Sequence, residues 1–492
     1  MMGKNIKDKN NGKSLMVNIG YNMISQIVAL VVPLFTSPYI ARVFNPELIG
    51  RYSYALANSS YFVLVECLGF SLYGQIKIAA KRDDKEETSR LFWEIIILKL
   101  LLMALSSIAY LAIIFIRSDA EQRGLSGIML LNIIAAGIDV TWFLNGLEEF
   151  KTIAIRSIGV RLVNIISIFT LIKSDENFLL YAVIMQGANL IANLTVYPKV
   201  FKNVRWCGLK GISIFQHFRP AAIYFVPGVV NTIFSSSDKT MLGIWSGDFE
   251  VGIYEQANKI SQICMNAVCA IGNVILPRAS YLYHNDNAKE MADKLIYTSL
   301  GIVQLISVPA VLGIISISEE FVLIFFGTGY EKSAAVLVIL SFNVMLIALS
   351  NLCGQQCLIA RERQREYNIA IIISALVNVI LNVFAIKAAR SIGAAIASVL
   401  ASVVCLYSII YMSKGILSIK KIFLGSWKYY VSGLLMSVLI ISVKKILYGS
   451  LGVMILHVAV GIIIYALFLI LFKEQIVQEV WQDILKKLRR NG

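Results

Sequence analysis

The sequence has few charged residues, and this shortage excludes the largest class of proteins. Asp, Glu, Lys and Arg together make up 15% of the 492 residues, against about 25% in soluble domains. Because 58% of the residues are hydrophobic, the chain has too little polar surface to face water on all sides. The composition excludes a soluble catalytic domain and predicts an all-α integral membrane protein.

Motifs that hold metals or nucleotides are also missing. Only three histidines occur, His217, His284 and His457, and none has an H-E-x-x-H or comparable metal-binding spacing. The match to a phosphate-binding loop at Gly12-Lys13-Ser14 fails, because Lys7 stands where its first glycine belongs. The seven cysteines are scattered and fit packing positions in apolar segments. We therefore expect no cofactor, no metal site and no ATP-driven step.

The excess of basic residues, 45 Lys and Arg against 30 Asp and Glu, indicates the orientation of the chain. These bases lie in short loops between apolar segments rather than in one patch, which argues against nucleic-acid binding. About 31 of them lie in the loops on the side of the two termini. By the positive-inside rule, both termini are expected in the cytoplasm.

Apolar segments bounded by charged clusters predict about fourteen membrane-spanning helices. The expected spans are 15–41, 49–76, 91–116, 124–146, 152–172, 176–198, 216–246, 251–280, 293–317, 333–360, 366–387, 391–413, 424–443 and 450–472. After the last span, residues 474–490 carry apolar residues on one face and predict a short amphipathic helix.

Two pairs of short matches indicate an internal repeat. Gly50-Arg51-Tyr52-Ser53-Tyr54-Ala55 and Gly252-Ile253-Tyr254-Glu255-Gln256-Ala257 both fit G-x-Y-x-x-A, and Leu162-Val163-Asn164 recurs as Leu376-Val377-Asn378. The pattern predicts two six-helix lobes at residues 1–210 and 211–414, related by a pseudo-two-fold axis, with two additional spans and the tail at 415–492. Chance similarity between apolar segments is the alternative explanation.

Several longer motifs run along most of the chain. They are Pro33-Leu34-Phe35-Thr36-Ser37-Pro38-Tyr39-Ile40-Ala41-Arg42, Gly69-Phe70-Ser71-Leu72-Tyr73-Gly74, Asp139-Val140-Thr141-Trp142-Phe143-Leu144-Asn145-Gly146, Asp238-Lys239-Thr240-Met241-Leu242-Gly243 and Leu276-Pro277-Arg278. In these motifs the sequence resembles the bacterial polysaccharide flippases, the Wzx-type O-antigen and capsule transporters of the multidrug/oligosaccharidyl-lipid/polysaccharide exporter superfamily.

This resemblance implies a function in surface polysaccharide biosynthesis, including O-antigen, capsule and lipopolysaccharide. A member of the family moves an undecaprenyl-diphosphate-linked oligosaccharide from the cytoplasmic to the outer leaflet of the bacterial plasma (inner) membrane. Independently of the resemblance, the two parallel lobes predict alternating access about a cavity between them, and a carboxylate deep in a span predicts coupling to a proton or sodium gradient. Catalysis is not expected. The partners of such a family member would be the lipid-linked oligosaccharide, membrane lipids, and the polysaccharide polymerase and chain-length proteins.

Basic residues inside spans are the candidates for binding the anionic diphosphate, because a charge in the membrane costs at least a few kcal/mol and needs a partner. The tyrosines of the G-x-Y motifs can bind sugar faces or form an interfacial belt. The alternative for the basic residues is that they snorkel to the membrane surface. The candidate substrate-binding residues are Arg42, Lys99, Arg161, Lys239, Lys259 and Tyr254.

Acidic residues inside spans are the candidates for ion coupling, because a carboxylate there needs a cation or a proton. For Asp139 the alternative is a structural ion pair with a base such as Arg161. The candidate ion-coupling residues are Glu66, Asp139, Asp238 and Glu255.

Two other functions remain open from the sequence alone. A multidrug exporter of the same superfamily would share the two lobes, although two additional spans fit the polysaccharide branch better. A membrane glycan polymerase is less favoured, since the first outer loop here consists of little more than Phe44-Asn45-Pro46-Glu47-Leu48.

Overall fold

The computed structural model describes residues 2–117, 120–208, 213–283, 289–413, 415–447, 449–474 and 478. These residues form helices and short connections with no β-strand among them, which confirms the all-α fold class. The chain divides into two compact units, Met1–Thr240 and Met241–Gly492. The lobe boundaries expected near residues 210 and 414 stay a prediction.

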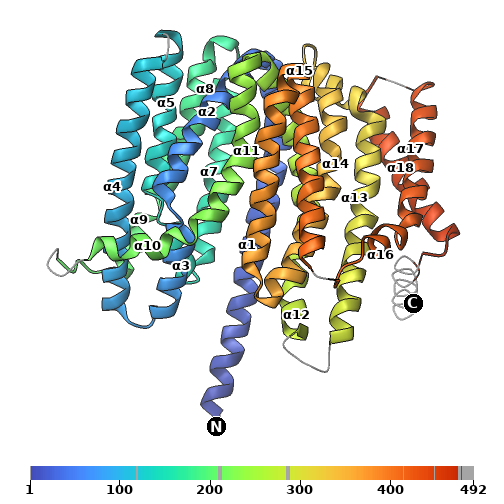
Figure 1. Cartoon of the computed structure of the whole chain (residues 1–492). Coiled ribbons are helices and arrows are strands. Elements are labelled where there is room, and N and C mark those ends of the chain that lie inside the picture. Colours follow the sequence, from blue (N-terminus) through green and yellow to red (C-terminus); the bar gives the residue numbers. More distant parts are fainter. Residues whose placement is uncertain are drawn as a thin grey trace. The chain divides into compact units, whose positions relative to one another are not determined.

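Long helices packed along one another build the N-terminal unit (Figure 1). Helix α5 packs against α2, α4 and α8, while α7 packs against α1 and α8. The helices of this unit are α1 (Met2–Val43), α2 (Pro46–Cys67), α3 (Phe70–Lys81), α4 (Lys85–Arg117), α5 (Ala120–Gly137), α6 (Thr141–Gly146), α7 (Phe150–Leu171), α8 (Phe178–Leu194), α9 (Tyr197–Asn203), α10 (Phe218–Ala222) and α11 (Phe225–Ser246), whose last turns belong to the second unit, with the 3-10 turns η1 (Asp175–Asn177) and η2 (Ile214–His217).

In the C-terminal unit, α14 is the central helix, because it packs against α12, α13 and α15. Helix α17 packs against α13 and α18. The helices of this unit are α12 (Asp248–Tyr283), α13 (Lys289–Phe326), α14 (Lys332–Cys353), the π-helical turn η4 (Gly354–Leu358), the 3-10 turn η5 (Ile359–Arg361), α15 (Gln364–Met412), α16 (Ile419–Leu424), α17 (Trp427–Lys444) and α18 (Leu451–Leu471).

The backbone leaves the helical region inside one expected span and between two others. The span expected at 49–76 breaks into α2 and α3 at Leu68 (φ 31°) and Gly69 (φ 76°). A Cβ atom on Gly69 would lie 2.4 Å from the carbonyl oxygen of Ala221, so this position requires glycine. Helix α15 has a similar break at Ala389 and Arg390, between the two spans expected there.

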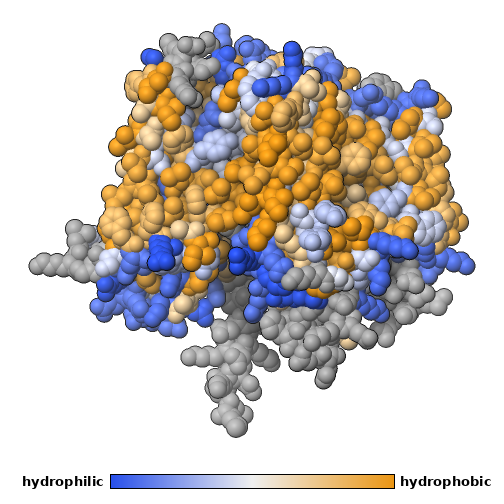
Figure 2. All heavy atoms as spheres, viewed as in Figure 1, coloured by the Kyte–Doolittle hydropathy of each residue, from blue (hydrophilic) through white to orange (hydrophobic). Residues whose placement is uncertain are grey.

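Ten segments of the described residues are long and apolar enough to cross a membrane. One of them, Gln364–Met412, covers two expected spans on either side of its break. On the faces visible in Figure 2, each unit carries a broad hydrophobic band with hydrophilic residues towards the ends of its helices. The protein is therefore a multi-pass membrane protein. The expected spans 216–246, 251–280 and 424–443 coincide with α11, α12 and α17, and their crossing of the membrane stays a prediction.

Two sequence predictions fall wholly or partly outside the residues that the structure describes. The amphipathic helix expected at 474–490 lies, apart from Glu474 and Gln478, outside the described residues. The Leu276-Pro277-Arg278 motif belongs to α12, and its side chains also lie outside the described part.

Candidate functional site

A polar site lies in the N-terminal unit, where α5 ends and α6 begins. Asp139 occupies this break, between the two helices of the expected span 124–146. The ammonium group of Lys99, on α4, donates hydrogen bonds to the carbonyl oxygens of Ala136 at 3.2 Å and of Asp139 at 2.7 Å. Because a helix break inside a membrane leaves carbonyl groups that need partners, Lys99 stabilises the break. Lys99 is only 1% exposed, so the structure does not support its snorkelling to the membrane surface.

The carboxylate of Asp139 is held by the first residue of α6. Its Oδ1 atom accepts hydrogen bonds from the backbone N–H of Thr141, at 3.0 Å, and from the Thr141 hydroxyl. Arg156, on α7, donates from Nη1 to Thr141 Oγ1 at 3.3 Å and to Asn193 Oδ1, on α8, at 3.2 Å. The positive charge of Arg156 also acts on Asp139. These contacts join α6, α7 and α8 through polar groups.

Arg161, which the sequence offers as the partner of Asp139, lies one turn further along α7. Its Nη1 atom donates to the backbone carbonyl of Ser25 on α1 at 2.8 Å. Within the described part of the chain, Arg161 and Asp139 form no ion pair, so Arg161 is not the base of the alternative structural pairing for Asp139. The charge of Arg156 acts on Asp139, and the ammonium group of Lys99 lies 2.7 Å from the Asp139 carbonyl oxygen.

Asp139, Arg156 and Arg161 are among the residues that surround a cavity of about 410 Å³ between α5, α6, α7 and α8. Its volume lies within the range of about 300–1,000 Å³ that is typical of ligand sites. Guanidinium groups bind phosphates through charge-assisted hydrogen bonds, and side-chain amides can both donate to and accept from sugar hydroxyls. The lining residues are Asn132, Ala135, Ala136, Asp139, Thr141, Arg156, Ser157, Val160, Arg161, Asn164, Asn189, Ala192 and Asn193.

A largely apolar groove of about 780 Å³ adjoins this cavity between α7 and α8. The two share Arg156, Val160 and Asn164, so these residues border both the polar cavity and the apolar groove. The groove is lined by Thr152, Ile155, Arg156, Gly159, Val160, Val163, Asn164, Ser167, Val183, Ile184, Gly187, Ala188, Ile191 and Thr195.

Glu66 is a second buried acid of the N-terminal unit. It is fully buried on α2, and neither oxygen of its carboxylate has a hydrogen-bond partner among the described residues. Lys99 is near enough for its charge to act on Glu66, and Cys67 lies within reach of the charges of Lys99, Glu66 and Asp139. The structure thus brings together three of the predicted residues, namely Lys99, Glu66 and Asp139.

Three further predicted residues of the N-terminal unit, Arg42, Asp238 and Lys239, do not line the polar cavity between α5, α6, α7 and α8. Arg42 is exposed near the end of α1, whereas Asp238 is buried and Lys239 half-buried on α11. Next to them in sequence, Thr240 donates to Asn58 Oδ1 at 3.1 Å and accepts from the Tyr61 hydroxyl at 3.3 Å.

In the C-terminal unit, the predicted residues lie near the start of α12. The hydroxyl of Tyr254, which is 3% exposed, lies 3.3 Å from Ser398 Oγ, and Asn378 Nδ2 donates to the same oxygen at 3.4 Å. Lys259 forms an ion pair with Glu255 one turn away, with 3.7 Å between Nζ and Oε1. This ion pair lies within one helix and one turn.

The sequence analysis missed Arg156 and the four asparagines of the cavity. Arg156, Val160 and Asn164 recur every fourth residue, and so do Asn189 and Asn193, which places each set on one helix face. Such a polar stripe within an apolar span was the signal that could have identified them.

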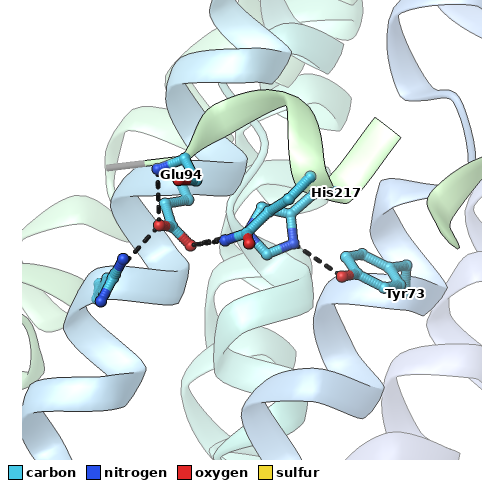
Figure 3. Close-up of polar contacts among 6 residues, drawn as sticks. Tyr73, Glu94 and His217 are labelled. Atoms are coloured by element: carbon cyan, nitrogen blue, oxygen red, sulfur yellow. Dashed lines mark hydrogen bonds and ion pairs between the residues drawn. The ribbon is translucent and has the colours of Figure 1, made fainter. Parts of the chain in front are cut away.

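A separate buried polar cluster fastens the segment before α10 to the long helix α4 (Figure 3). Glu94 Oε2 lies 2.8 Å from His217 Nε2, and the opposite ring nitrogen of His217 lies 2.7 Å from the Tyr73 hydroxyl. Glu94 Oε1 accepts from the backbone N–H of Ser213 at 3.0 Å and from Arg90 Nε at 3.2 Å. The cluster is structural, because its members satisfy one another.

The C-terminal unit has an apolar groove of its own, of about 560 Å³, between α13, α17 and α18. No charged residue is among those that line it.

Comparisons with known proteins show the family to which this chain belongs. The family of sequences described as polysaccharide biosynthesis protein matches residues 15–283, which is more than half of the chain. The family described as lipid II flippase MurJ matches residues 221–472. A protein of Escherichia coli (strain K12) named as an O-antigen transporter is 26% identical over 393 residues, which cover 78% of this chain and 93% of that protein.

Solved structures show the same fold. The lipid II flippase MurJ in an inward closed conformation superposes with a TM-score of 0.74 at 16% identity, covering 93% of this chain and all of that chain. An inward-facing multidrug resistance MATE family transporter of the MOP superfamily gives a TM-score of 0.56 at 15% identity over 81% of this chain and 98% of that one. Fold and family are those of transporters rather than of enzymes.

Proposed function

Because this chain belongs to the polysaccharide biosynthesis protein family, within the multidrug/oligosaccharidyl-lipid/polysaccharide exporter superfamily, we propose that it flips undecaprenyl-diphosphate-linked oligosaccharides from the cytoplasmic to the outer leaflet. A flippase function for lipid-linked oligosaccharides is supported by the match to the lipid II flippase family and by the related O-antigen transporter. The carried glycan would enter a surface polysaccharide such as O-antigen, capsule or lipopolysaccharide.

The observation that carries the proposal is the polar cavity of the N-terminal unit. Each intramembrane arginine costs about 3 kcal/mol by insertion scales, so two arginines in one cavity indicate a function that needs positive charge there. Arg156 and Arg161 would bind the diphosphate, while the asparagines would bind the first sugars. Four asparagines from α5, α7 and α8 beside two arginines suit an anionic, hydroxyl-rich substrate better than a cationic drug.

Coupling to a proton or sodium gradient is part of the same proposal. Asp139 lies in the cavity beside Arg156, and Glu66 is buried near Lys99 with both oxygens unpaired among the described residues. A carboxylate in such a place would exchange a proton or sodium ion as the substrate's negative charge arrives and leaves. The membrane potential contributes as well, since one charge moved through 100 mV is worth about 2.3 kcal/mol.

The cellular setting follows from the substrate. The protein would lie in the bacterial plasma membrane with both termini in the cytoplasm, as the distribution of basic residues favours. It would hand its product to the polysaccharide polymerase and chain-length proteins.

The test is the lipid content of cells that lack this protein. We expect a polyprenyl-diphosphate oligosaccharide to accumulate on the cytoplasmic face and to disappear when the wild-type protein is restored. The double variant Arg156→Gln, Arg161→Gln should fail to clear it, whereas Arg219→Gln, at an exposed position outside the cavity, should clear it. Unchanged lipid-linked sugars together with altered tolerance of cationic drugs would reject the proposal in favour of drug export.

A further inference from the structure

The connector between α8 and α10, residues 195–217, lies in a part of the chain that has no acidic residue. Residues 177–237 contain five Lys and Arg and no Asp or Glu, whereas the loop at 81–87 mixes three bases with four acids. Within the connector, the side chains of Lys202 and Arg205 are exposed. Residues next to them in sequence therefore do not neutralise their charge, as they do in the earlier loop.

Backbone hydrogen bonds hold this connector on the first turns of α4. The backbone N–H of Arg205 donates to Ser89 Oγ at 3.0 Å, and the indole N–H of Trp93 donates to the Arg205 carbonyl oxygen, also at 3.0 Å. Lys85 Nζ donates to the carbonyl oxygen of Lys202 at 3.3 Å. Because these contacts use the backbone groups of Lys202 and Arg205, the position of the connector does not depend on the two charged side chains.

Aromatic rings lie beside these two bases. Trp206 packs edge-on against Trp93 with 4.5 Å between the ring centroids, and Phe201 stacks on Trp93 at 6.5 Å. Trp206 is nevertheless 61% exposed and Phe201 54% exposed, so both rings present a face to the surroundings. Exposed tryptophan is typical of the boundary between membrane and water. We define Phe201, Lys202, Arg205 and Trp206 as the connector patch.

The height of the connector on this unit agrees with such a boundary. Figures 1 and 2 share one view, and α10, at the end of the connector, lies where the hydrophobic band of the unit gives way to hydrophilic residues. Apolar rings next to bases match the order of acyl chain and headgroup at the surface of a bilayer.

We propose that the connector patch binds the headgroup of an anionic phospholipid. Lys202 and Arg205 hold the phosphate by charge-assisted hydrogen bonds, and the two exposed rings lie against the start of its acyl chains. Lys199 takes no part, because it pairs with Glu149 at 3.0 Å. A zwitterionic headgroup carries a cation of its own, so the patch selects for net negative charge. The patch lies outside the polar cavity, and this inference does not depend on the proposed function.

The experiment measures contact between Trp206 and lipid in nanodiscs that hold the purified full-length protein. Phosphatidylglycerol brominated on its acyl chains quenches tryptophan fluorescence on contact, and diluting it into unlabelled phosphatidylcholine gives its relative affinity. The same titration with Trp206→Phe isolates the signal of Trp206. We expect the wild type to prefer phosphatidylglycerol, and the double variant Lys202→Gln, Arg205→Gln to weaken that preference by roughly 25-fold, since each base near an anionic surface contributes a factor of about five.

The matched control is the double variant Arg365→Gln, Lys420→Gln, which removes two exposed bases from the C-terminal unit. It should keep the wild-type preference, and added salt should lower that preference in the wild type. Equal quenching by brominated phosphatidylglycerol and brominated phosphatidylcholine in the wild type would overturn the proposal and favour a water-soluble protein as the occupant. A preference that the patch variant and the control lose equally would also overturn it, because it would reflect the net charge of the protein rather than a site.

Discussion

Replacing Arg156 by glutamine removes the positive charge that lies between the polar cavity and the apolar groove. The wild-type side chain donates to Thr141 and Asn193 and supplies the charge near Asp139. Glutamine keeps an uncharged N–H donor at the position of the arginine Nε, so the variant removes the charge while retaining most of the side chain's apolar stem. A hydrogen bond to a charged group contributes about 1.5–3 kcal/mol, against about 1 kcal/mol for a neutral one.

If the diphosphate binds at Arg156, exchanging the charged donor for a neutral one costs about 0.5–2 kcal/mol and weakens substrate binding by roughly 2- to 30-fold, since 1.4 kcal/mol corresponds to a factor of ten. The assay is the rate at which reconstituted vesicles translocate the lipid-linked oligosaccharide as its concentration is varied. The expected change is a raised substrate concentration for half-maximal rate, with the protein eluting as a folded species in detergent. Arg219→Gln provides the control. Indistinguishable concentration dependence in the two variants would refute the role of Arg156.

Three further predictions follow from individual contacts. Glu94→Ala should destabilise the protein by about 3–5 kcal/mol, because it leaves His217 and the Ser213 N–H without their buried partner. A thermal unfolding scan that matches the wild type would contradict this prediction. Asp139→Asn should abolish the acceleration of transport by an imposed proton or sodium gradient, and a retained response to both ions would remove Asp139 from the coupling. Gly69→Ala should lower the melting temperature, because Gly69 has a φ of 76° and a Cβ atom there would lie 2.4 Å from the carbonyl oxygen of Ala221. Gly127→Ala, the control, should leave the melting temperature unchanged.

The fold was largely predictable from the sequence, because the membrane restricts a chain of this composition to apolar helices. Each expected span coincides with helical residues, and the resemblance to polysaccharide flippases agrees with the family that the chain matches. The breaks at Leu68–Gly69 and at Asp139 were not predicted. They depend on tertiary partners distant in sequence, namely the close approach of Ala221 and the ammonium group of Lys99.

The candidate site was predicted only in part, for a physical reason. Treating each intramembrane charge as an individual candidate selected Lys99, Glu66 and Asp139, which the structure places near one another. It also selected Arg161, which lines the cavity but bonds to Ser25 instead of pairing with Asp139. Arg156 was missed because it lies close to the predicted start of its span, where a base is usually explained by the membrane surface. Which helix faces enclose a cavity depends on how α7 and α8 pack, and this cannot be derived from the periodicity of either helix alone.

The most direct test of the central claim is translocation by the purified protein alone. Vesicles would contain a polyprenyl-diphosphate oligosaccharide labelled on its sugar, and a membrane-impermeant glycosidase would report how much of it faces outwards. We predict that wild-type protein makes the protected fraction accessible, and that the double variant Arg156→Gln, Arg161→Gln leaves it protected. The account would be contradicted if folded wild-type protein left the protected fraction the same as in protein-free vesicles, both with and without an ion gradient.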